Sequence, residues 1–162
     1  MNFILDTGAL LSLPQSVYFE ELIKQKKLFT TKEVMEEIHN IAQYDDILGI
    51  AAKKIIKKKQ LLEIGFPKKL LQIKIEPAEL SVFSLGKEKG YFIITDDMHA
   101  ARIAKEKENI KSAPSFYLLL LLYKQKKISK ENLKEDIQKI VYNRNWSSGV
   151  LYEYAKEIIR GL

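Results

Sequence analysis

Residues 91–97 read Tyr91-Phe-Ile-Ile94-Thr95-Asp96-Asp97 and give the clearest strand signal in the chain. A short apolar run that stops at polar residues is typical of a buried strand. The N-terminus repeats this arrangement, because the run Phe3-Ile-Leu5 leads into Asp6-Thr7-Gly8. Groups that follow the strands of a parallel sheet meet at one edge of it. We therefore expect Asp6, Asp96 and Asp97 to lie close together.

Helical patterns alternate with short apolar runs outward from these two strands. Further strands are expected at 28–30 and 61–64, and helices at 31–38, 46–60, 77–90, 100–108, 114–125, 130–141 and 150–159. This alternation predicts an α/β fold in which a mostly parallel sheet is flanked by helices. We expect one domain over residues 1–125, with a helical C-terminal extension over 126–162 packed on it.

Two local features of these helices can be predicted from residue types. In the helix at 46–60, the apolar stripe is expected to consist of Ile47, Ile50, Ala51 and Ile55, with lysines on the other faces. Trp146-Ser-Ser148 is expected to cap the last helix.

The composition excludes several classes of protein. The 162 residues suit one domain and include no cysteine and two histidines, which argues against disulfide scaffolds, zinc or iron–sulfur sites and thiol catalysis. The longest apolar run, Phe116–Tyr123, is far shorter than the roughly 20 residues that cross a bilayer. No basic segment precedes an apolar stretch at the N-terminus, so we expect no signal peptide and a cytoplasmic protein.

The charge of the chain is unevenly distributed. The net charge is +6, but residues 1–50 carry a balance of −4 and residues 51–75 a balance of +7. The helix at 46–60 holds like-charged i,i+4 pairs among Lys53, Lys54, Lys57 and Lys58, and a phosphate backbone alongside would relieve their repulsion. The alternative is that these lysines form an ordinary solvent-exposed helix face with no ligand.

Acidic residues at the expected sheet edge form the candidate site. Glu37, near the end of the helix at 31–38, and Glu79, at the start of the helix at 77–90, join the strand-end acids. Clustered carboxylates repel one another unless a hard cation such as Mg²⁺ or Mn²⁺ neutralises them. Each acid also has an ordinary structural role: Asp6 in a turn, Asp96 or Asp97 as a helix cap, and Glu79 beside a helix dipole.

The order of these motifs resembles the PIN-domain ribonucleases. Leu5-Asp6-Thr7-Gly8-Ala9-Leu10 is similar to the opening motif of that family, and Thr31-Lys-Glu-Val-Met-Glu-Glu-Ile38 to its second motif, in which the acid aligns with Glu37. Glu79-Leu-Ser-Val-Phe-Ser-Leu85 resembles the third motif and Ile93-Ile-Thr95-Asp96-Asp97 the fourth. The tail, with Lys127-Ile-Ser129 and Arg144-Asn-Trp146-Ser147, resembles a subgroup related to VapC toxins.

The resemblance implies a PIN-like three-layer sandwich and a metal-dependent endoribonuclease. Asp6, Glu79 and Asp97 would then hold Mg²⁺ or Mn²⁺, with Asp96 and Glu37 on outer waters or a second ion, and an acidified water would attack the phosphorus. Thr7 and Thr95 would orient the carboxylates, and Arg102 would touch the phosphate. The family often forms homodimers, and in VapC toxin–antitoxin systems an antitoxin protein holds the nuclease inactive.

Two other functions compete with this one. Gly8 and Glu79 stand where most members of the family have Ser or Asn and Asp, which favours a catalytically impaired RNA-binding module or RNA-processing factor. A phosphoacceptor domain of the receiver type also binds Mg²⁺ through strand-end acids. It ranks third because only one acid, Asp6, directly follows the first strand.

Overall fold

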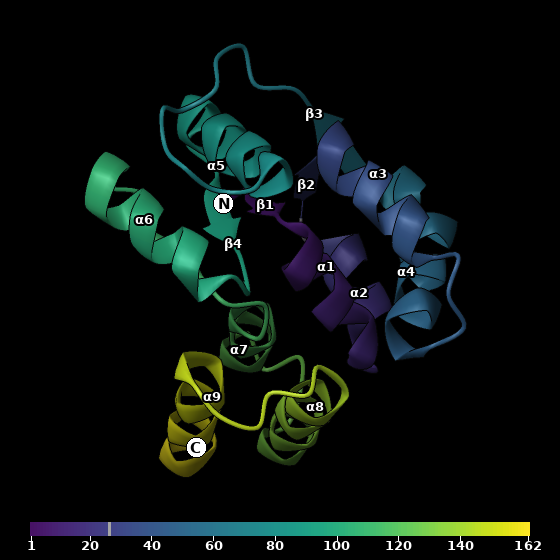
Figure 1. The fold of residues 1–162 in the computed structure, drawn as a ribbon. Helices are drawn as coiled ribbons and strands as arrows, with labels where there is room; N and C mark the ends of the chain where they lie inside the picture. The colour runs from purple at the N-terminus through teal and green to yellow at the C-terminus, as the bar shows by residue number, and fades with distance from the viewer. Residues whose placement is uncertain (26) are drawn as a thin grey trace.

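A parallel sheet lies at the centre of the computed structural model, which describes residues 1–25 and 27–162 (Figure 1). Its described strands are β1 (Phe3–Leu5), β2 (Leu28–Thr31), β3 (Leu62–Gly65), β4 (Phe92–Ile94) and β5 (Ser112–Ala113), in the order β3-β2-β1-β4-β5. Every strand pair is parallel, which confirms the predicted fold class.

Helices connect and cover the strands (Figure 1). In chain order they are α1 (Thr7–Ser12), the 3₁₀ turn η1 (Leu13–Gln15), α2 (Phe19–Gln25), α3 (Lys32–Ile41), α4 (Ile47–Lys57), the 3₁₀ turn η2 (Lys59–Leu61), α5 (Pro77–Lys89), α6 (Met98–Glu108), α7 (Tyr117–Lys124), α8 (Lys130–Asn143) and α9 (Val150–Gly161). Within the described residues, none of these helices is long and apolar enough to cross a membrane.

Side chains of β1 and β4 point alternately to the two faces of the sheet, and helices cover both faces in a three-layer sandwich. Phe3 pairs with Phe92 in register, and the ring of Phe92 stacks on Tyr117 of α7 at a centroid distance of 5.5 Å. The next register pair, Ile4 and Ile93, points to the opposite face, because successive strand residues alternate between faces. There α5 approaches so closely that a Cβ on Gly86 would lie 2.7 Å from Cγ1 of Ile93. The sheet is therefore covered by α5 on one face and α7 on the other.

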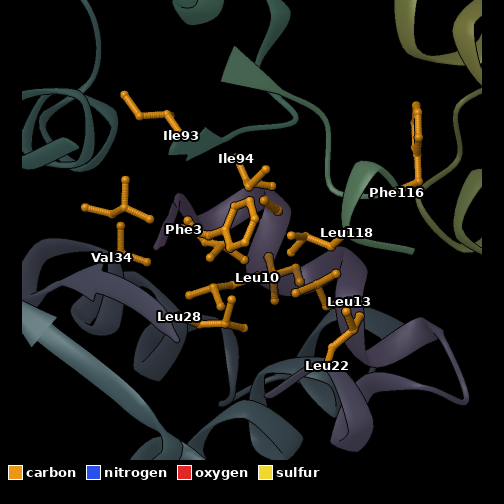
Figure 2. Packing of buried hydrophobic residues seen from close by; sticks show 14 of the residues in the cluster. Phe3, Leu10, Leu13, Leu22, Leu28, Val34, Ile93, Ile94, Phe116 and Leu118 are labelled. Atoms are coloured by element: carbon orange, nitrogen blue, oxygen red, sulfur yellow. The ribbon is translucent and has the colours of Figure 1, made fainter. Parts of the chain in front are cut away.

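The hydrophobic core surrounds β1 and the first helices. Figure 2 shows Phe3, Leu10, Leu13, Leu28 and Leu118 gathered in this buried cluster. All five are at most 2% exposed. Because β1 is buried along its whole length, the residue that follows it is held at the sheet edge by a rigid frame.

The C-terminal helices lie beside the α/β part. Figure 1 shows α8 and α9 next to each other and close to α7. Side chains of α8 reach back to the segment after α1: Asn143 donates to Gln15 at 2.8 Å, and Asp136 accepts a hydrogen bond from Ser16. A helical C-terminal segment is thus present, while its separation from the first 125 residues stays a prediction.

Three local predictions need correction. In α4, Ile47 and Ile50 are about half exposed, and the buried positions are Gly49, Ala51, Ala52 and Ile55, since α1 and α3 pack on that side. The helix α9 begins after Gly149, which has a φ of 90° and no side-chain cap, so the predicted serine cap is wrong. The strand β5 escaped prediction because it has only two residues and neither is strongly apolar.

Candidate active site

Four acids from three parts of the chain line one pocket at the carboxyl edge of the sheet. Asp6 directly follows β1, Asp96 and Asp97 follow β4, and Glu79 lies in the first turn of α5. The pocket has a volume of about 360 Å³ and is lined by Asp6, Gly8, Glu79, Asp96, Asp97, Met98 and Arg144. A larger cavity of about 720 Å³ adjoins α8 and α9, but its described lining contains no carboxylate.

Asp6 is the buried centre of the pocket, with 1% of its surface exposed. Its Oδ1 accepts the N–H of Ala9 at 2.7 Å and so caps α1, and its Oδ2 accepts the hydroxyl of Thr95. Burial, with the nearby charge of Asp96, raises the pKa of Asp6 from 3.8 to about 7. The capping role and the site role therefore coincide in one carboxyl group, whose negative charge lacks a compensating cation among the described side chains.

Asp96 is held by protein donors on both of its oxygens. Ser12 of α1 donates to Oδ2 at 2.6 Å, and the backbone N–H of Ser115 donates to Oδ1 at 2.8 Å. Burial raises its pKa, while these donors and the charge of Arg144 lower it in part. Both oxygens of Asp96, like those of Asp6, therefore already accept hydrogen bonds from the protein.

Asp97 and Glu79 each keep one carboxylate oxygen without a hydrogen-bond partner among the described residues. Asp97 caps α6 through Oδ1, which accepts the N–H of Ala100 at 2.8 Å, and its own N–H is held by Thr95 at 3.0 Å. Oε2 of Glu79 is buried without a hydrogen-bond partner among the described residues. Burial raises the pKa of Glu79, and the charges of Asp97 and Glu37 raise it further.

Glu37 lies beside the pocket rather than in its wall. Its Oε2 accepts the hydroxyl of Thr7 at 2.5 Å, so the two predicted orienting threonines both donate to an acid of the site. Helix α3 is fixed against α5 by a 2.6 Å hydrogen bond between Thr31 and Ser81, and Thr31 also caps α3. Glu36, the neighbouring acid, instead pairs with Lys32 at 3.3 Å.

The predicted phosphate-binding side chains do not line the pocket. Lys53 pairs with Asp45 at 2.5 Å and Lys58 with Glu20 at 3.0 Å, whereas Lys54 and Lys57 are exposed. Arg102 is exposed on α6, and its Nη2 lies 3.4 Å from Nδ1 of His99. A role for these residues in binding RNA stays a prediction.

Three polar residues of the site were not singled out as site residues from the sequence. Ser12 and Ser115 hold Asp96, and Arg144 lines the pocket from the far end of the chain. Serine in a helix or after a two-residue strand carries no local signal. Arg144 does carry a weak one, because it is one of only three arginines in a chain that otherwise uses lysine.

The carboxylates fit a hard divalent cation. Asp6 and Glu79 both have raised pKa values because burial and neighbouring acids disfavour their charge, and one oxygen of Glu79 has no partner among the described residues. A bound cation would stabilise the ionised form of both carboxyl groups and would give the unpaired oxygen of Glu79 a partner. Among residues 1–25 and 27–162, no three acids or histidines already form a closed ligand cluster. A cation bound by these acids would take further ligands from water, as Mg²⁺ and Mn²⁺ commonly do.

Comparison with known protein families gives a match over nearly the whole chain. The family model DUF3368, described as a PIN domain, matches residues 2–160. The chain belongs to the PIN-domain family. PIN domains are typically nucleases and typically use divalent metals.

A solved structure agrees with the fold of this PIN domain. It is a PilT N-terminus domain protein from the hyperthermophilic archaeon Sulfolobus solfataricus P2, with a TM-score of 0.51 and 16% sequence identity. The match covers 75% of this chain and 92% of that one, and at this identity it supports the fold alone. The comparison with curated proteins gave no match.

The strand order of this PIN domain excludes the receiver-type alternative. Receiver domains such as CheY order their strands 2-1-3-4-5, whereas the described strands here follow 3-2-1-4-5. The acids therefore belong to a different topology from that of a phosphoacceptor domain.

Thr95 gives a test of how the carboxylates are oriented. Thr95→Val removes the hydroxyl that donates to Asp6 and accepts from Asp97, and we expect Mn²⁺ binding to weaken about 10–100-fold. Thr30→Val is the matched control, because Thr30 is equally buried and donates at 3.0 Å to the carbonyl of Leu5. Both variants should lose about 1–2 kcal/mol of stability in thermal unfolding. Equal Mn²⁺ affinities in calorimetry would show that Thr95 does not prepare the site.

Proposed function

We propose that this PIN domain is a metal-dependent endoribonuclease that hydrolyses phosphodiester bonds of RNA with Mg²⁺ or Mn²⁺. The observation that carries the proposal is the buried carboxyl of Asp6, which shares a pocket with Glu79, Asp96 and Asp97. Four acids around one cavity, against a single arginine and with no ion pair to any of them among the described residues, are suited to binding a cation.

Glu79 and Asp97 each have an oxygen without a hydrogen-bond partner among the described residues, and Asp6 is the most buried acid of the pocket. Asp6, Glu79 and Asp97 would hold the cation, while Asp96 and Glu37, whose oxygens accept hydrogen bonds from the protein, would orient water. A divalent cation bound there acidifies a water molecule and neutralises charge that develops on the phosphate. Hydrolysis joins the water oxygen to phosphorus and breaks the bond to one sugar oxygen, which leaves with a proton.

The charge of the surface supports a nucleic-acid substrate. The chain carries a net charge of +6 although its candidate site is acidic, so the basic groups lie elsewhere on the protein. Lys54 and Lys57 are exposed on α4, where they can contact phosphates that continue beyond the site. Affinity for RNA should then fall steeply as the salt concentration rises.

Removal of metal tests the proposal. We expect the EDTA-treated protein to leave a fluorescently labelled single-stranded RNA intact, and Mn²⁺ or Mg²⁺ to restore internal cleavage. Gel electrophoresis of the products measures this, and the same RNA incubated with metal but without protein is the control. Cleavage that persists in EDTA would contradict the proposed function.

The same assay decides the alternative of an impaired RNA-binding module. That function predicts RNA binding in a gel-shift assay with no cleavage under any divalent metal. The toxin role, the antitoxin partner and the homodimer stay predictions. Growth arrest on induced expression, relieved by an inactive variant, is the outcome that would support a toxin.

A further inference from the structure

A basic side chain from the C-terminal part of the chain enters the acidic pocket. Arg144 follows α8 directly and lines the cavity together with the four acids. An ideal Cβ on Gly8 would lie 3.6 Å from Nη2 of Arg144 and 3.7 Å from Oδ1 of Asp6. The guanidinium therefore lies beside the first turn of α1, within van der Waals distance of the Cβ position at Gly8.

The hydrogen-bonding capacity of Arg144 is not used up by the protein. Its Nε is buried and has no partner among the described residues. No ion pair joins Arg144 to a carboxylate in the part of the chain that the structure describes, although acids line the same pocket. A buried donor without a partner costs free energy, which an acceptor in the pocket would recover.

The backbone around Arg144 is fixed from two sides. Its N–H closes α8 by donating to the carbonyl of Ile140 at 2.9 Å. The preceding residue, Asn143, donates to Gln15 of η1 at 2.8 Å, and the ring of Trp146 lies 5.9 Å from the guanidinium carbon. The segment that carries Arg144 is thus tied to η1, which directly follows α1.

A guanidinium beside a cation site suits an oxyanion. Its planar fork of N–H donors matches two oxygens of one phosphate better than a lysine ammonium does. In the described structure the other pocket-lining side chains that ionise are all acids, so Arg144 is the group there that can attract an anionic substrate.

We propose that Arg144 binds the scissile phosphate of RNA, donating to its non-bridging oxygens while the acids hold the cation. This inference rests on the proposed endoribonuclease function. It assigns phosphate recognition to the C-terminal segment, and it replaces Arg102 as the arginine at the reacting group. The rival role is a resident counter-ion, in which the guanidinium neutralises the acids and competes with the metal.

The experiment compares Arg144→Gln and Arg144→Lys with wild type and with Arg160→Gln, an exposed arginine of α9 outside the acidic pocket. RNA affinity is measured by fluorescence anisotropy in EDTA, where no cleavage occurs, and kcat/KM in Mn²⁺. Circular dichroism melting confirms that each variant folds.

For Arg144→Gln we expect RNA binding to weaken about 10-fold and kcat/KM to fall about 100-fold, with Mn²⁺ affinity unchanged or tighter. Arg144→Lys should recover part of both losses, and Arg160→Gln should behave as wild type. Wild-type RNA affinity in Arg144→Gln overturns the inference, and so does a rise in activity together with tighter Mn²⁺ binding. If wild type binds RNA through Arg144 but cuts none, the proposed function fails, and only the binding of an RNA phosphate by Arg144 stands.

Discussion

Asp97→Asn is expected to lower Mn²⁺-dependent cleavage of RNA by about 10²–10³-fold while leaving the fold intact. Asn has the shape of Asp and caps a helix equally well, so the hydrogen bond from Ala100 that starts α6 is retained. The variant removes the negative charge beside Glu79, and a preorganised electrostatic contact of this kind is typically worth that factor in rate.

Asp46→Asn is the matched control for this variant. Asp46 caps α4 by accepting the N–H of Gly49 at 2.7 Å, the same role that Asp97 plays for α6. It does not line the acidic pocket. Equal melting temperatures for the two variants, with activity lost only in Asp97→Asn, separate the site role from the capping role. Wild-type activity in Asp97→Asn would remove Asp97 from the site.

A second large effect is expected in the pH dependence of stability of the metal-free protein. The pKa of Asp6 is about 7 in the folded protein, because burial and Asp96 disfavour its charge, against an ordinary value of 3.8. Between these two values the folded state holds a proton that the unfolded state has released. The free energy of unfolding therefore falls as pH rises from about 4 to about 7, and the loss is complete above that range.

Asp6→Asn isolates this contribution. Wild type should lose about 3 kcal/mol relative to Asp6→Asn between pH 5 and pH 8, a window that covers most of the 3.8-to-7 shift. Urea unfolding at both pH values in EDTA measures the difference. Asp6→Asn should be the more stable protein at pH 8, although the variant is expected to be inactive as a nuclease.

Added Mn²⁺ gives the complementary result. Because the cation binds the ionised carboxylates and competes with protons, it should raise the melting temperature of wild type more at pH 8 than at pH 5. The same addition should leave Asp6→Asn nearly unchanged. A wild-type stability that is equally high at both pH values without metal would contradict the buried charge at Asp6.

Local sequence patterns were sufficient to predict that Asp6 and Asp97 lie at the same edge of the sheet. Asp6 and Asp97 each follow a short apolar strand, and parallel pairing of β1 with β4 then brings them to one edge. Residue types also showed where α5 begins, because Pro77 is favoured in a first helical turn and Glu79 follows it there.

Features that depend on distant contacts could not be predicted in this way. The strand β5 exists because Ser112 and Ala113 pair with Ile93 and Ile94, and nothing in its two residues signals a strand. The buried face of α4 is decided by its contacts with α1 and α3, which leaves the apolar Ile47 and Ile50 half exposed.

Some residues of the pocket could not be predicted either, because they reach it through contacts between distant parts of the chain. Ser12 meets Asp96 across 84 positions of sequence, and Arg144 reaches the pocket only because α8 is tied back to η1. Such contacts follow from topology and packing, which a single sequence without its fold does not contain.

Anomalous diffraction from a crystal soaked in Mn²⁺ is the sharpest test of the metal site, because it locates the cation without reference to activity. We expect an anomalous peak in the pocket of about 360 Å³ beside Asp6, Glu79 and Asp97, and a weaker peak in Asp97→Asn. A Mn²⁺ peak elsewhere on the protein, with no density in this pocket at saturating metal, would contradict it.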